Sequence, residues 1–210
     1  MIGSATNGAR GGTLIDAVRP RINSLPWNVL LVLGFGTLMA LFARISIPLP
    51  FTPVPITGQT FGVLLTGLLL GSRRGALAML AYLAEGLAGL PVFANGASAW
   101  TPSAVGVPVI IGPTAGYLIG FPVAAFVVGL LAERGWDRGV LTTFAAMLIG
   151  EVVIYLFGLA WLSHYVGLAN VLTFGFTPFA LGEVLKMALA ALLLPGGWAL
   201  LRSRRGELTR

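Results

Sequence analysis

The sequence predicts an all-α membrane protein, a bundle of six transmembrane helices with both termini on the cytoplasmic side. Hydrophobic residues make up 57% of the 210 positions and charged residues only 10%, whereas a soluble domain carries roughly a quarter charged residues. The apolar stretches are continuous and not alternating, which favours helices over strands. Positive charge gathers in alternate gaps between these stretches, and this pattern is typical of cytoplasmic loops.

The basic residues that set this orientation form four groups along the chain. They are Arg10, Arg19 and Arg21 before the first apolar stretch, then Arg73 with Arg74, then Arg134 with Arg138, and finally Arg202, Arg204, Arg205 and Arg210. The intervening gaps hold only Arg44 and His164. If the Arg-rich gaps are cytoplasmic, the number of crossings is even, and six crossings account for every group.

The first half of the chain contains a tail and three expected helices. Residues 1–26 are rich in Gly, Ser, Asn and Arg, and we expect them to form a mobile cytoplasmic tail. The first helix, 27–45, spans roughly 28 Å at 1.5 Å per residue. The second and third, 58–70 and 76–90, are short, so they span only if the bilayer thins or flanking turns extend them.

The second half contains three longer apolar stretches, which we expect to be helices over 115–132, 140–162 and 178–201. Each of these is long enough to cross the hydrocarbon core with little or no adjustment. The six helices form one membrane domain, 27–202. A basic cytoplasmic tail, 203–210, closes the chain.

Two outer connections do not resemble simple turns. Residues 47–57 carry four prolines at nearly every other position, so this segment cannot be helical and is stiff and extended. Residues 91–114 contain no charged side chain. Both connections lie on the non-cytoplasmic side and are too apolar for solvated linkers. They predict long non-helical loops that cover a binding pocket, although rigid connectors remain the simpler alternative.

Four ionisable residues fall inside the expected helices, where a charge costs at least ~3 kcal/mol. Glu183 and Lys186, the only lysine, are three residues apart and therefore share a helix face. They form either a self-satisfied ion pair or a site that faces a polar ligand. Glu151 is either hydrogen-bonded to a neighbour, or protonated, or has a functional role. Glu85 lies near a helix end, where it can reach the membrane–water interface.

Several function classes are disfavoured by what the sequence lacks. With no cysteine, disulfides and thiolate catalysis are excluded, and no G-x-x-x-x-G-K-[ST] phosphate loop is present, so the chain does not hydrolyse ATP. The net charge of +6 is divided among short turns, so we expect contact with the lipid bilayer and no nucleic acid. We expect no cofactor and no metal, since His164 has no second His or Cys for one.

Three alternatives stay open at this point: a solitary proton-coupled carrier that uses Glu85, Glu151 or Glu183, a membrane-embedded enzyme built on His164 and Glu151, and a structural membrane protein. Uptake that collapses with the proton gradient would identify the carrier. The absence of saturable small-ligand binding would identify the structural protein.

Several short motifs follow one another along the chain. They are residues 53–60 (PVPITGQT), Leu70-Gly71 with Arg74-Gly75, residues 89–93 (GLPVF), residues 112–121 (GPTAGYLIGF) and residues 182–186 (GEVLK). Together they resemble the BioY family, the biotin-binding S components of energy-coupling-factor (ECF) transporters. The likeness covers residues 35 to 195. It departs in two places, because the family has Asp at the position of Glu183 and Gly at that of Ala115.

The resemblance implies a six-helix, multi-pass protein of the cell membrane that binds biotin from the outer side and is not an enzyme. It implies a membrane T subunit and two cytoplasmic ATPase subunits as partners, and it leaves homo-oligomerisation open. Small residues of the first helix would contact the T subunit, namely Gly36, Ala40 and Ala43. Internal packing is the alternative role for these three residues.

The resemblance also implies a set of substrate-binding residues. Glu183 would accept the ureido N–H groups of biotin, Lys186 would donate to the ureido oxygen, and Asn95 could do either. Lys186 or Arg44 could instead neutralise the carboxylate of biotin. The remaining residues are Trp100, Phe93 and Tyr117, which would cover the apolar ring and chain, and Gln59 and Thr57, which would belong to the lid with the proline-rich segment.

Overall fold

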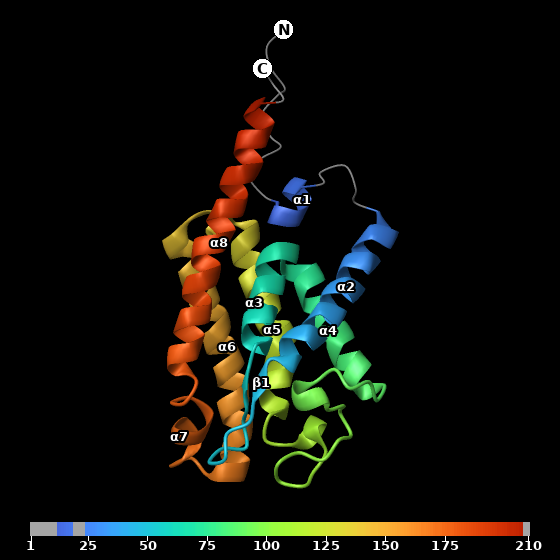
Figure 1. The fold of residues 1–210 in the computed structure, drawn as a ribbon, viewed down its shortest axis with the longest axis vertical. Coiled ribbons are helices and arrows are strands. Elements are labelled where there is room, and N and C mark those ends of the chain that lie inside the picture. The colour runs from blue at the N-terminus through green and yellow to red at the C-terminus, as the bar shows by residue number, and fades with distance from the viewer. Residues whose placement is uncertain (1–11, 19–23, 208–210) are drawn as a thin grey trace.

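The computed structural model describes residues 12–18 and 24–207. Most of the expected N-terminal tail, and residues 208–210 of the expected C-terminal tail, lie outside the described residues. The described part is a bundle of long helices with irregular loops at one end (Figure 1). It is mostly helical, in agreement with the predicted class.

The principal helices follow the predicted apolar stretches closely. They are α2 (Leu25–Arg44), α3 (Gln59–Leu70), α4 (Ser72–Leu87), α5 (Ala115–Glu133), α6 (Val140–Val166) and α8 (Ala180–Glu207). Within the described residues, four of these, α2, α5, α6 and α8, are long and apolar enough to cross a membrane. The other two are shorter, since 12 and 16 helical residues span only about 18 and 24 Å.

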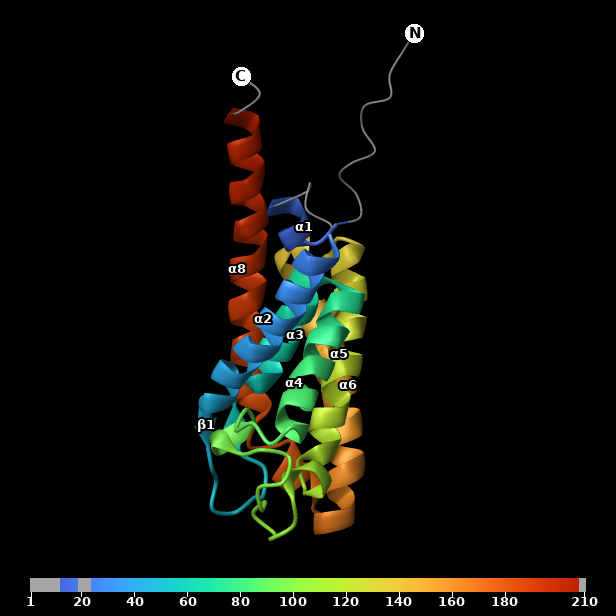
Figure 2. The same cartoon turned by 90° about the vertical axis from the view of Figure 1, so that its right-hand side faces the viewer.

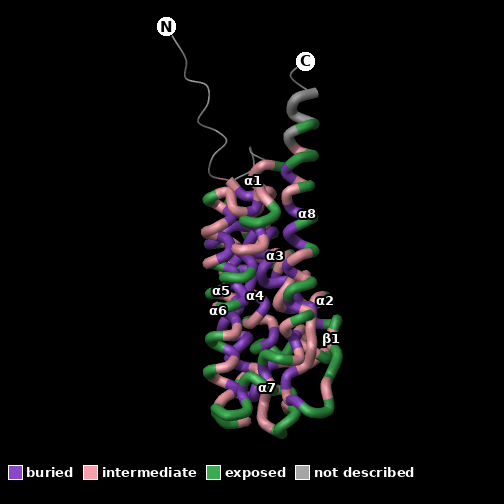
Figure 3. Tube along the Cα trace, turned by 90° about the vertical axis from the view of Figure 1, so that its left-hand side faces the viewer, coloured by how far each residue is buried: buried purple, intermediate pink, exposed green. Residues whose placement is uncertain are grey.

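Helix α5 occupies the centre of the bundle, and it packs against α3, α4 and most extensively against α6. Small residues permit these close approaches. A Cβ added to Gly116 would lie 2.3 Å from Cβ of Trp161, and one added to Gly150 would lie 2.3 Å from Val128. The buried residues accordingly run along the middle of the bundle (Figure 3). This packing fixes the inner faces of α5 and α6 relative to each other.

One end of the bundle carries the irregular segments (Figures 1 and 2). The proline-rich segment is not helical, as predicted, and its two ends pair as β1 (Ser46–Ile47) and β2 (Ile56–Thr57), which are antiparallel. The second connection contains two short 3-10 turns, η1 (Ala94–Gly96) and η2 (Val109–Ile111). Helix α7 (Val171–Gly175) precedes α8 at the same end.

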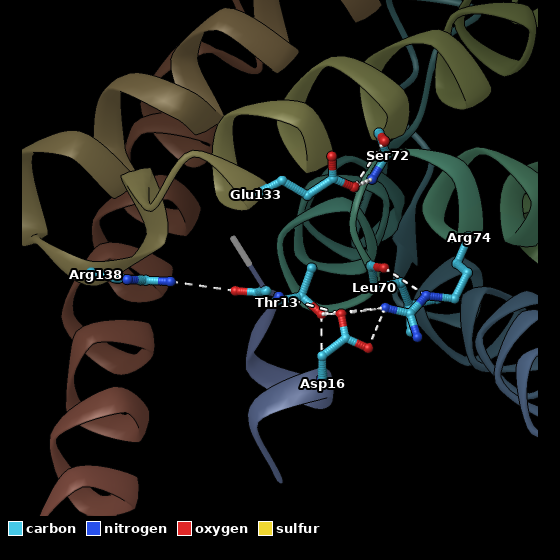
Figure 4. Close-up of polar contacts among 8 residues, drawn as sticks. Thr13, Asp16, Leu70, Ser72, Arg74, Glu133 and Arg138 are labelled. Atoms are coloured by element: carbon cyan, nitrogen blue, oxygen red, sulfur yellow. Dashed lines mark hydrogen bonds and ion pairs between the residues drawn. The ribbon is translucent and has the colours of Figure 1, made fainter. Parts of the chain in front are cut away.

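The opposite end carries α1 (Leu14–Val18), which the sequence did not predict (Figure 4). Arg74 donates from Nη2 to both carboxylate oxygens of Asp16 at 2.7 Å, and its Nε donates to the carbonyl of Leu70 at 3.0 Å. The carboxylate of Glu133 accepts hydrogen bonds from N and Oγ of Ser72 at 2.7 and 2.8 Å, and so satisfies the first turn of α4. These contacts tie α1, α3, α4 and α5 together.

Helix α8 is fixed near this same end by η3 (Trp136–Arg138). Nε1 of Trp198 donates to the Asp137 carboxylate at 2.6 Å, and the guanidinium of Arg138 lies 4.7 Å from the centre of the Trp198 ring. Burial raises the pKa of the Asp137 carboxyl, and the hydrogen bond from Trp198 opposes that rise. Beyond this contact, α8 continues past the rest of the bundle (Figure 2).

Candidate ligand-binding pocket

A cavity of about 330 Å³ lies inside the loop end of the bundle. It is lined by the proline-rich segment, the loop around η1, residues 101–104, the first turns of α3 and α5, the inner face of α6 and the start of α8. This volume lies in the range of small-molecule sites. The two long non-helical loops therefore do line a pocket, as the sequence predicts.

Glu183 and Lys186 form an ion pair on α8, with 2.8 Å between Oε1 and Nζ. Thr60 bridges the pair, because its hydroxyl donates to Glu183 at 2.7 Å and accepts from Lys186 at 3.1 Å. Lys186 also donates to the carbonyl of Thr57 at 2.6 Å. Glu183 lines the cavity and Lys186 does not, so the ammonium group ties α8 to the end of the proline-rich segment.

Gln59 and Thr57 lie where the proline-rich segment enters α3, and both line the cavity. Nε2 of Gln59 donates to the hydroxyl of Tyr82 at 2.9 Å, and that hydroxyl donates to the carbonyl of Val92 at 3.0 Å. The Thr57 hydroxyl accepts a hydrogen bond from N of Gln59 at 3.2 Å. This chain of bonds connects the two outer loops through α3 and α4.

Phe93 anchors the second loop. Its side chain is buried and lies edge-on to Tyr82, with 5.3 Å between ring centres. A Cβ at Gly86 would lie 2.2 Å from the Phe93 ring, so only glycine leaves room for it. Two residues later, Asn95 adopts a left-handed conformation with φ of 57°, which Asn tolerates better than most residues. Both Phe93 and Asn95 line the cavity.

Aromatic residues of α5 and α6 form the wall on the other side of the cavity. Tyr117 donates from its hydroxyl to the carbonyl of Gly175 at 3.0 Å and lies edge-on to Tyr155, which packs in turn against Phe176. Tyr117 and Tyr155 both line the cavity. The sequence analysis named Tyr117 but missed Tyr155, although the latter lies one helical turn after Glu151 and therefore on the same face.

Besides Lys186, two other candidate residues lie outside the cavity lining. Trp100 is exposed and outside the cavity lining, and its Nε1 donates to the carbonyl of Leu87 at 2.9 Å. Arg44 is also outside the lining. Its Nη2 donates to the carbonyl of Pro91 at 3.0 Å, and its guanidinium lies against Gly96. Both side chains brace the second loop from outside.

The small residues of α2 divide between the two sides of the helix. Gly36 is buried against α4, where an added Cβ would lie 3.3 Å from the carbonyl of Ala78. Ala43 is fully buried and Ala40 is half-buried. Gly36 and Ala43 therefore face into the bundle and do not present an outward surface. The exposed side of α2 carries leucines instead, namely Leu30, Leu33 and Leu41.

A bundle of long apolar helices that encloses a cavity, with the carboxylate of an ion pair in its lining, is typical of membrane proteins with a small-molecule pocket. The model of the BioY family matches residues 18–203, and the chain belongs to the BioY family. This result confirms the family that the motifs predicted. Family members are named as transporters, in agreement with the expectation that the chain is not an enzyme.

Individual relatives resemble the chain over most of its length. It is 39% identical to a probable biotin transporter of Pyrococcus horikoshii, over 79% of this chain and 93% of the relative. It is 40% identical to a biotin transporter of Rhizobium etli, over 79% and 89% of the two chains. A crystal structure of the S component for biotin from an ECF-type ABC transporter shares the fold, with a TM-score of 0.65, 24% identity, and coverage of 86% and 92%.

Proposed function

We propose that this chain captures biotin at the outer face of the membrane, as the substrate-binding S component of an ECF-type transporter. The observation that carries this proposal is the network of Glu183, Lys186 and Thr60 at the wall of an otherwise largely apolar cavity. Biotin combines a ureido ring, which needs polar partners, with an apolar ring and chain. Membership of a family whose relatives are named biotin transporters supports the same substrate.

The proposed contacts follow from how the side chains are already engaged. Glu183 faces the cavity and accepts from the ureido ring. The ammonium group of Lys186 donates its three hydrogen bonds to Thr57, Thr60 and Glu183. It therefore holds the Glu183 carboxylate and the proline-rich lid in place. The apolar ring packs between Phe93 and Tyr117.

The remaining candidate residues take supporting positions. Asn95 offers its amide to the ligand from the second loop, and Thr57 and Gln59 belong to the inner edge of the lid. Trp100 supports the second loop through its bond to Leu87 and does not contact the ligand.

We further propose that all six principal helices span the cell membrane, with both termini cytoplasmic. Helix α1 and the C-terminal end of α8 lie at the same end of the bundle (Figure 1), which supports an even number of crossings. The short α3 and α4 are completed by their flanking turns and by a thinned bilayer. The pocket then opens on the outer side.

Energy for uptake would come from partners, a membrane T subunit and two cytoplasmic ATPases. The support for this proposal is the absence of a phosphate-binding loop from the whole sequence. The contact with the T subunit remains assigned to α2, and its exposed leucines, Leu30, Leu33 and Leu41, offer an apolar outward surface for it.

The test is equilibrium binding of labelled biotin to the purified protein in detergent, for wild type, Lys186→Ala and Arg73→Ala. We expect saturable binding by wild type and a loss of at least tenfold in affinity for Lys186→Ala, because that change leaves Glu183 buried without its cation. Arg73 is an exposed cation in the first turn of α4 and does not line the cavity, so Arg73→Ala should bind like wild type.

Two outcomes would contradict these proposals in different ways. If folded wild-type protein binds no biotin, the substrate is wrong. If Lys186→Ala remains folded and binds as wild type does, the substrate stands and the site on α8 is wrong. Thermal unfolding of each variant in the same detergent shows whether it is folded.

A further inference from the structure

Glu151 is a buried carboxylate in the wall of the cavity with no partner inside the described part of the chain. It lies in the middle of α6, 3% exposed, and lines the same cavity as Glu183. Neither of its carboxylate oxygens accepts or donates a hydrogen bond among residues 12–18 and 24–207. Buried polar groups are almost always hydrogen-bonded, and each exception requires an explanation.

The contrast with Glu183 shows that this arrangement is specific to Glu151. Glu183 is neutralised by Lys186 and receives a further bond from Thr60. Glu151 has neither kind of partner. Its position is also fixed, because the neighbouring Gly150 packs so closely on Val128 and Leu64 that a Cβ there would lie 2.3 and 2.5 Å from their side chains. Helix α6 thus holds the carboxyl group against the cavity.

The surroundings of Glu151 define what can approach it. Apart from Glu151 itself, α5 and α6 contribute Tyr117, Leu118, Phe121, Ile154 and Tyr155 to the cavity lining. Among the described residues that line the cavity, none is Lys or Arg. A carboxyl group accepts hydrogen bonds in either protonation state, so a ligand that brings an N–H donor would satisfy an oxygen that has no partner here. An anionic group is disfavoured at this part of the wall, since no Lys or Arg of the described lining is there to pair with it.

We propose that Glu151 is a specificity-determining contact that accepts an N–H hydrogen bond from the ureido ring of the ligand. This inference rests on the proposed function, with biotin as the ligand. At neutral pH the two ureido N–H groups are the only hydrogen-bond donors of biotin, and its other polar end is a carboxylate, for which the described cavity lining offers no Lys or Arg. The ring therefore faces Glu151 and the valerate chain points away from it.

The experiment measures binding of four ligands to wild type, Glu151→Leu and Glu151→Gln. The ligands are biotin, the two biotins methylated on one or the other ureido nitrogen, and biotin methyl ester. Glu151→Leu should weaken biotin binding roughly 10- to 100-fold, the usual range for a lost hydrogen bond to a charged group. Glu151→Gln keeps the length and one acceptor, and should lose less.

The methylated ligands separate a direct contact from a structural role. Wild type should discriminate strongly against at least one N-methyl isomer, and Glu151→Leu should lose that discrimination. The methyl ester should change affinity by the same factor in all three proteins. If Glu151→Leu weakens every ligand equally, the residue has only a structural role and the inference is overturned.

A matched control is Glu85→Gln, because Glu85 is a second glutamate within a helix but lies outside the cavity lining. It should bind all the ligands as wild type does. If Glu151→Leu does not fold, the comparison of Glu151→Gln with wild type on the two N-methyl isomers decides the question. If wild type binds no biotin, the proposed function is refuted. If wild type binds biotin and Glu151→Leu binds it with the same affinity, this inference alone is refuted.

Discussion

Thr60 is the residue whose single hydroxyl joins the two charged groups of the pocket. Thr60→Val keeps the shape of the side chain and removes both of its hydrogen bonds, which leaves a buried carboxylate and an ammonium with one partner fewer. We expect biotin affinity to fall roughly 5- to 30-fold, equivalent to about 1–2 kcal/mol. Labelled-ligand binding measures this directly.

The control for this prediction is Thr66→Val. Thr66 lies on the same helix and is buried, but its hydroxyl donates to the carbonyl of Gly62 within the helix at 2.7 Å. Its replacement should leave biotin affinity within about twofold of wild type, since it contacts neither charged group. Equal losses in the two variants would mean that the Thr60 bridge has no special role in binding.

At this scale, the sequence predicted contacts within one helix better than contacts between elements. Glu183 and Lys186 could be paired because residues three apart share a helix face. The bridge from Thr60 could not be predicted, because it comes from another helix 123 positions away. The place of Trp100 depends on its bond to Leu87 across the loop, and composition alone carries no signal for that bond.

At the scale of elements, glycines set how closely α5 and α6 approach each other. In Gly116→Ala the new Cβ would lie 2.3 Å from Cβ of Trp161 and 2.4 Å from the carbonyl of Phe157. The helices must separate, so we expect a loss of about 1–3 kcal/mol in stability, seen as a lower Tm in detergent. Gly34→Ala is the control, because no atom lies within 4 Å of its added Cβ.

If both alanine variants unfold at the temperature of wild type, close packing at Gly116 does not contribute to stability.

The helices themselves were predictable, because long apolar runs give clear boundaries: 115–132 was expected and Ala115–Glu133 is observed. The short elements were not predictable. Helix α1 depends on a contact with Arg74, 58 positions away from Asp16. The strands β1 and β2 have two residues each, too few to carry a periodic pattern.

At the scale of the whole molecule, the proposed topology can be tested because the chain has no cysteine. Single cysteines at Ser98 and at Arg73 lie at opposite ends of the bundle, and the proposed topology places them on opposite sides of the membrane. A membrane-impermeant maleimide applied to intact cells should label the cysteine at Ser98 and label the one at Arg73 only after lysis. The reverse pattern, or labelling of both in intact cells, would contradict the proposed orientation.

The length of α8 gives the pocket a mechanical property. The helix is secured at Trp198 by Asp137 and Arg138, and Glu183 lies 15 residues away, about 22 Å along the axis. If α8 tilts about its contact at Trp198, Glu183 therefore moves farther than the residues close to that contact. A tilt of about 5° about this contact would move Glu183 by about 2 Å. A small change in the angle of α8 would therefore alter the cavity wall without unfolding either α6 or α8.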